Sequence, residues 1–183
     1  WSKHQDTSVI GAVTIPERHN LLNDEDVRML DKMNCGVSYF ISQCIFNLDY
    51  AKQVIEDLAL SCNRQSIKPP TIIFTITACG SAKTLQFMEW LGIHVPEELK
   101  EDLKTSDDIL EKSVNICLDI ASALTTFCME RAIPFGFNIE SVAIRKAEIE
   151  ASIDIARGIG QMLKDKGLRK SSRAVPIPTS VNE

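Results

Sequence analysis

Residues Cys35 to Asn47 read Cys-Gly-Val-Ser-Tyr-Phe-Ile-Ser-Gln-Cys-Ile-Phe-Asn. This short and mostly apolar run follows a glycine, which is typical of a strand buried on both faces of a parallel sheet. Gln43 stands near the C-terminal end of the run, and two interpretations of it are open. Its amide is either a satisfied group where a strand meets a loop, or part of a site, because the C-terminal strand ends form the active-site floor of parallel α/β folds.

Strand and helix patterns alternate along the rest of the chain. Strands are predicted at residues 8–14, 37–46, 71–76 and 134–138, and helices at residues 23–36, 49–60, 81–91, 97–103, 106–131 and 141–163. A loop is predicted at residues 15–20, where Glu17 and Arg18 form at most an exposed ion pair of little energetic weight. Strands that alternate with helices indicate a parallel sheet with crossover helices, so the fold class is α/β with four consecutive β/α units.

Four such units are compatible with two arrangements of the sheet. They form either a small open sheet or one half of an eight-fold barrel, which typically needs ~250 residues. Residues 1–163 are predicted to form this unit, and residues 164–183 a basic and then Pro-containing tail. The tail is either a disordered linker or a segment that a partner orders.

Composition limits the classes of function. With 183 residues, 44% of them hydrophobic, the chain suits one globular domain. The net charge of −5 argues against a broad nucleic-acid surface, and no apolar run reaches the ~18 residues of a membrane span. The six cysteines form no Cys-x-x-Cys pair and the three histidines are dispersed. We therefore expect buried free thiols in the cytoplasm or another reducing compartment, with a metal site as the weaker alternative. The chain begins at Trp1 rather than Met, which leaves an upstream targeting sequence open.

An ordered series of motifs points to a family. The series comprises Thr14-Ile15-Pro16-Glu17-Arg18-His19, Lys32, the run 35–43, Gly92-Ile93-His94-Val95-Pro96 and Ile133-Pro134-Phe135-Gly136-Phe137. It resembles the second half of the methylenetetrahydrofolate reductase barrel over about residues 9–162. The resemblance implies strands five to eight of a (β/α)8 TIM-barrel flavoprotein, with the first half and its acidic proton donor before Trp1.

The resemblance also implies an activity in one-carbon metabolism and methionine biosynthesis. A flavin-dependent oxidoreductase of this kind reduces 5,10-methylenetetrahydrofolate to 5-methyltetrahydrofolate, with FAD as cofactor and NAD(P)H as co-substrate. The implied partners are a folate-like small molecule and whatever completes the barrel: the missing N-terminal half, a second copy or another subunit. The alternative is a family-derived structural or interaction subunit that has lost catalysis.

The resemblance assigns roles to particular residues and no catalytic residue to this half. It places Gln43 and Thr84 in substrate binding, but Thr84 stands where the family has a folate-contacting glutamine. Val142 stands where the family has an arginine that pairs with the folate tail, and Arg145 lies one helical turn further on. The resemblance therefore implies a flavin site that is better preserved than the folate site, and weak discrimination for the folate glutamate tail. Its cofactor-binding positions are Val13, Ile15, His19, Glu25, Lys32 and Ile41.

The chemistry of two of these residues suits their roles. The Gln43 amide can donate and accept hydrogen bonds at once, which suits a flat heteroaromatic ligand. The Lys32 ammonium suits a diphosphate, although on its own it is equally an ordinary solvated helix lysine. Without the resemblance, His19 would be interpreted first as a surface-loop residue.

Overall fold

The computed structural model describes residues 9–169. Its elements follow one another as β1 (Ile10–Thr14), α1 (Pro16–Leu22), α2 (Glu25–Asn34), β2 (Val37–Cys44), α3 (Leu48–Gln65), β3 (Thr71–Thr77), α4 (Ala82–Trp90), α5 (Glu97–Lys104), α6 (Ile109–Glu130), β4 (Phe135–Glu140) and α7 (Lys146–Asp165). The strands form one parallel sheet in the order β1-β2-β3-β4. The predicted α/β fold of four β/α units is therefore confirmed, and it is consistent with part of a TIM barrel.

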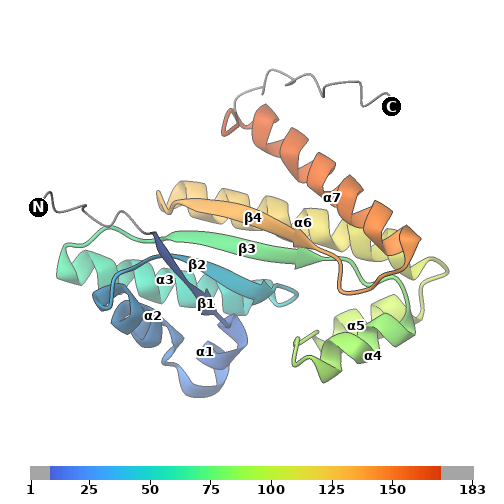
Figure 1. The fold of residues 1–183 in the computed structure, drawn as a ribbon, viewed down its shortest axis with the longest axis horizontal. Coiled ribbons are helices and arrows are strands. Elements are labelled where there is room, and N and C mark those ends of the chain that lie inside the picture. Colours follow the sequence, from blue (N-terminus) through green and yellow to red (C-terminus); the bar gives the residue numbers. More distant parts are fainter. Residues whose placement is uncertain (1–8, 170–183) are drawn as a thin grey trace, which may run out of the picture.

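Helices cover one face of the sheet. Phe40 on β2 and Phe74 on β3 are buried on that face, against Val54 and Leu58 of α3 and Leu124 of α6. Successive side chains of a strand point to opposite faces, so Tyr39, Ile41 and Ile73 lie on the other face, where they are only half-buried. Figure 1 shows α4 and α5 near each other beyond the end of the sheet to which the strand arrows point. These two helices pack over a smaller apolar cluster that includes Cys44 and Phe46.

The predicted loop at residues 15–20 is wrong, because Pro16 begins helix α1. A proline fits the first helical position, since its fixed φ suits the helix and its missing N–H would have had no helical partner. At the other end of the chain, the predicted helix at residue 141 begins only at Lys146, and residues 141–145 form a connection after β4.

Helix α7 ends at Asp165, close to the predicted start of the tail. Residues 170–183, including most of that tail, lie outside the described residues. Of the six cysteines, five are buried free thiols as expected, and Cys35 is exposed. Within residues 9–169, no helix is long and apolar enough to cross a membrane.

Candidate functional site at the carboxyl end of the sheet

The parallel strands bring their carboxyl ends to one edge of the sheet, and polar side chains gather there. Gln43 is half-buried, and its Oε1 atom is enclosed without a hydrogen-bond partner among the described residues. The hydroxyl of Thr77, at the end of β3, is likewise enclosed and unpartnered within residues 9–169. On β4, the Asn138 amide donates to Glu140 Oε1 over 2.6 Å. Unused hydrogen-bonding capacity at Gln43 makes this edge the candidate site for a polar heteroaromatic ligand.

Glu17 is a titratable group of this edge, and the predicted exposed ion pair with Arg18 is wrong. Both of its carboxylate oxygens are enclosed and lack a partner in the described part of the chain, so it forms no exposed ion pair with Arg18. Burial raises the pKa of Glu17 to about 7. Burial also raises the pKa of Cys44 to about 12, and the nearby Glu140 and Glu17 carboxylates add to that rise. Only the position of Glu17 directly after Pro16, at a strand end, would have marked it in the sequence.

Thr84 lies at the start of α4 with its hydroxyl turned inward. The Ser81 side chain caps the helix by accepting from Thr84 N over 3.1 Å. The Thr84 hydroxyl donates to Glu148 Oε1 over 2.6 Å, and Gly80 N donates to the same oxygen over 2.9 Å. Thr84 is therefore buried, and it joins the end of β3 to helix α7 through Glu148.

A surface cavity of about 350 Å³ opens beside Thr84. Its walls come from the start of α4 and from the connection after β4, namely Lys83, Thr84, Phe87, Val142, Ala143, Ile144 and Arg145. The Phe87 ring stacks on Trp90, with centroids 5.8 Å apart, and Ile144 is 98% exposed. Within residues 9–169, neither Lys83 nor Arg145 forms an ion pair. The cavity combines an apolar wall with two available cations.

On the β1 side of the sheet, β1 and β2 bring two of the predicted cofactor-binding residues together, and a third, Lys32 of α2, reaches the edge of β1. Val13 is exposed and pairs in register with Ile41 on β2. Lys32 Nζ donates to the Val13 carbonyl over 2.7 Å, which holds the ammonium beside the edge strand. Val13 and Ile41 therefore lie side by side on the uncovered face, and Lys32 reaches the edge of β1 from the side of the Phe40 ring, 6.0 Å from its centroid. The half-buried Ile15 follows one residue after the strand.

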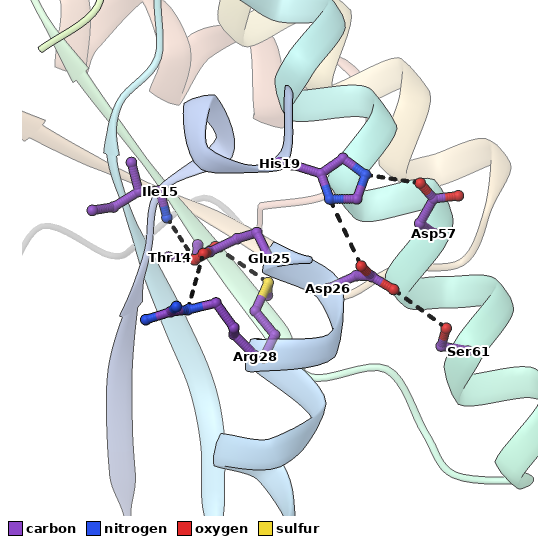
Figure 2. Close-up of polar contacts among 9 residues, drawn as sticks. Thr14, Ile15, His19, Glu25, Asp26, Arg28, Asp57 and Ser61 are labelled. Carbon is purple, nitrogen blue, oxygen red and sulfur yellow. Dashed lines mark hydrogen bonds and ion pairs between the residues drawn. The ribbon is translucent and has the colours of Figure 1, made fainter. Parts of the chain in front are cut away.

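The two remaining predicted cofactor-binding residues, His19 and Glu25, point into the interior (Figure 2). Glu25 is fully buried, and its Oε1 accepts from Ile15 N over 2.9 Å and from the Thr14 hydroxyl over 3.1 Å. His19 is 1% exposed, and its Nε2 lies 2.9 Å from Asp57 Oδ2. The residues present thus fit FAD only in part, since Val13, Ile15, Lys32 and Ile41 are accessible while His19 and Glu25 are engaged internally.

Comparisons with known proteins extend these observations. The sequence model of the family "Methylenetetrahydrofolate reductase" matches residues 2–135. The structure of an uncharacterized protein from Clostridium thermocellum that binds two copies of 5-methyl-5,6,7,8-tetrahydrofolic acid is similar, with a TM-score of 0.80 and 47% sequence identity. The match covers 84% of this chain and 54% of that one, so this chain spans about half the length of the Clostridium protein. No curated protein matches.

Proposed function

The chain belongs to the methylenetetrahydrofolate reductase family, and we propose that it binds a reduced folate at the carboxyl end of its sheet. The cavity beside Thr84 carries this proposal. A folate has a flat pterin, an aromatic middle and a glutamate tail. Phe87 and Ile144 offer apolar surface to the aromatic middle, and Lys83 and Arg145 offer charge to the tail carboxylates. The folate-binding Clostridium protein, with 47% identity, supports the same ligand class.

We propose that Arg145 takes over the tail contact that the family resemblance places at Val142. Both residues line the same cavity, and Arg145 is exposed. An arginine can hold a carboxylate with two parallel hydrogen bonds, each strengthened by charge. At the other end of the ligand, the free Oε1 of Gln43 suits an N–H of the pterin.

Calorimetric titration of 5-methyltetrahydrofolate into the full polypeptide that contains this chain tests the proposal. Replacing the tail contact in Arg145→Ala should weaken binding roughly 10- to 100-fold, the equivalent of ~1.5–3 kcal/mol. Gln43→Ala should weaken it about tenfold. Lys146→Ala is the matched control, because Lys146 follows Arg145 and is almost fully exposed outside the cavity. Unchanged affinity in both Arg145→Ala and Gln43→Ala would refute the proposed site.

We propose, as the finer function, flavin-dependent reduction of 5,10-methylenetetrahydrofolate with NAD(P)H. The paired Val13 and Ile41 support it, because apolar strand ends suit a flavin ring. Lys32 at the edge of β1 supports it as well, because an ammonium suits a diphosphate. Bound FAD would supply the hydride chemistry, while residues of this chain would bind and orient it. The internal contacts of His19 and Glu25 limit this support to four of the six expected residues.

Flavin absorbance separates the reductase from a non-catalytic interaction subunit. If the full polypeptide is a reductase, it should take up FAD, lose flavin absorbance with NADH or NADPH, and regain it with 5,10-methylenetetrahydrofolate. Gln43→Ala should slow one or both half-reactions while FAD stays bound. A protein that remains colourless after addition of FAD, yet binds folate, would support the interaction subunit instead.

A further inference from the structure

Glu25 completes the hydrogen bonding at the end of β1. The strand pairs with β2 as far as Thr14, which lies opposite Ser42. The next backbone N–H, that of Ile15, donates to Glu25 Oε1, and so does the Thr14 hydroxyl. The other carboxylate oxygen lies 3.8 Å from Arg28 Nε. The carboxylate of Glu25, in the first turn of α2, thus accepts a backbone N–H that a neighbouring strand would otherwise accept (Figure 2).

His19 holds the next element, α1, in a similar way. Its Nε2 atom contacts Asp57 of α3, and its Nδ1 atom lies 3.7 Å from Asp26 Oδ1 of α2. Asp26 in turn lies within 3.5 Å of the Ser61 hydroxyl on α3. One buried imidazole therefore links three helices that surround the end of β1.

We propose that Glu25 and His19 are positioning residues, which hold the end of β1 and helix α1 in place from the interior and contact no ligand. Their effect on the candidate site runs through Val13 and Ile15, the two residues that flank Thr14. Figure 2 shows the Ile15 side chain directed away from Glu25, although the backbone N–H of Ile15 is bonded to it. The inference rests on the proposed function, in which Val13 and Ile15 face the cofactor. It differs in assigning His19 and Glu25 to the support of those two residues rather than to contact with the cofactor.

Moving Glu25 toward a ligand would leave two hydrogen-bond donors at the end of β1 without their carboxylate acceptor. For its carboxylate to reach a ligand, the bonds to Ile15 N and the Thr14 hydroxyl would have to break. Thr14 is 2% exposed, so its hydroxyl would lose its carboxylate acceptor in a buried position, which is unfavourable. His19 is 1% exposed, and turning its ring toward a ligand would break the 2.9 Å contact with Asp57. Because the Asp57 side chain is 38% exposed, its carboxylate would regain water, so the cost is smaller than at Glu25. Both residues are therefore committed to the scaffold before any ligand arrives.

Thermal unfolding of the ligand-free full polypeptide tests this inference without any assumption about folate. Glu25→Ala should lower the Tm by about 4 °C or more, because a buried bond to a charged group is lost. Glu25→Gln, which keeps an acceptor oxygen, should recover part of that loss. Thr14→Val removes one of the two donors to Glu25. The Tm of the double variant Thr14→Val, Glu25→Ala should therefore fall by less than the sum of the two single decreases. His19→Ala and Asp57→Ala form a second such pair.

Titrations with FAD and 5-methyltetrahydrofolate distinguish a positioning residue from one that contacts the ligand. A positioning residue should change the ligand-free Tm and any ligand affinity together, and Glu25→Gln should partly rescue both. Arg145→Ala should instead weaken folate binding with the ligand-free Tm unchanged. An unaltered ligand-free Tm in Glu25→Ala, with a tenfold or greater loss of FAD affinity, would overturn the inference. If Glu25→Ala does not fold, Glu25→Gln and Thr14→Val decide: lowered Tm values support positioning, and wild-type values refute it.

Discussion

Glu17 is a single carboxyl group whose surroundings make the stability of the molecule depend on pH. It follows Pro16 in the first turn of α1, and neither of its oxygens has a hydrogen-bond partner among the described residues. Burial favours the neutral form and raises the pKa from 4.5 to about 7. The folded protein therefore binds this proton more tightly than the unfolded chain does.

Stability should accordingly fall as the pH rises through the interval between these two pKa values. The contribution of Glu17 is fully present below pH 4.5 and is lost progressively up to about pH 7, by at most about 3 kcal/mol. Glu17→Gln is neutral at every pH and should remove this part of the loss. Denaturant unfolding at pH 5 and pH 8 measures it, with the exposed Glu98→Gln as control. An equal fall in wild type and Glu17→Gln would contradict the assignment.

Thiol reactivity should distinguish one cysteine from the other five. Cys35 is exposed, whereas the others are buried, and burial raises the pKa of Cys44, Cys117 and Cys128 to about 12 and that of Cys79 to about 11. A protonated, enclosed thiol is a poor nucleophile. Native protein treated with iodoacetamide should therefore gain one label rapidly, at Cys35, as mass spectrometry would show. Equally fast labelling of a second cysteine would contradict this burial pattern.

At the scale of elements, Glu148 joins helix α7 to the turn between β3 and α4. It is 3% exposed, and its Oε1 accepts from both Gly80 N and the Thr84 hydroxyl. A Cβ atom at Gly80 would lie only 2.4 Å from Glu148 Cγ, so the backbone approaches the carboxylate as closely as a glycine permits. This junction holds together the two segments that wall the candidate folate cavity.

Glu148→Ala should therefore destabilise the protein by about 2 kcal/mol or more, because it leaves two donors without their acceptor. Glu148→Gln, which retains an oxygen at this place, should lose less. Denaturant unfolding checks both, and Glu150→Ala is the matched control, since Glu150 is exposed two residues further along α7. A stability of Glu148→Ala equal to that of the control would show that the junction contributes little.

Within the described residues, the whole molecule leaves one face of its sheet uncovered, and no further strand pairs with β1 or β4. Lys32 and Glu25 occupy only the end of the β1 edge, at Val13 and Ile15. On the β1 side Ile10 is 50% exposed, and on the β4 side Ile149 and Ile153 of α7 are about as exposed. Unpaired edges next to apolar surface favour association with other chains. This arrangement is what half of a closed barrel would present to the half that completes it.

We therefore expect the 183-residue chain, expressed alone, to associate rather than to sediment as a compact monomer. Ile10→Lys places a charge on the β1 edge and should reduce this association. Leu60→Lys is the control, because Leu60 is similarly exposed but lies on helix α3 rather than on an edge strand. A compact, cooperatively unfolding monomer of the unaltered chain in analytical ultracentrifugation would refute the expectation.

The sequence by itself determined the order and type of the elements. The apolar run of β2, the β-branched run of β3 and the helical stripes between them are local patterns, and each acts over a few residues. Parallel pairing then followed from the alternation of strands with helices. The local pattern was ambiguous at Pro16, which suits both a loop and a first helical turn, and there the loop prediction was wrong.

Only the tertiary structure decided what individual polar side chains do. Glu25 meets Ile15 ten residues away, His19 meets Asp57 across 38 residues, and Glu148 meets Gly80 across 68. No local pattern encodes such pairs, because burial and hydrogen bonding depend on how whole helices pack against the sheet. The family resemblance assigns His19 and Glu25 to cofactor binding, and the packing of α1, α2 and α3 directs both side chains into the interior.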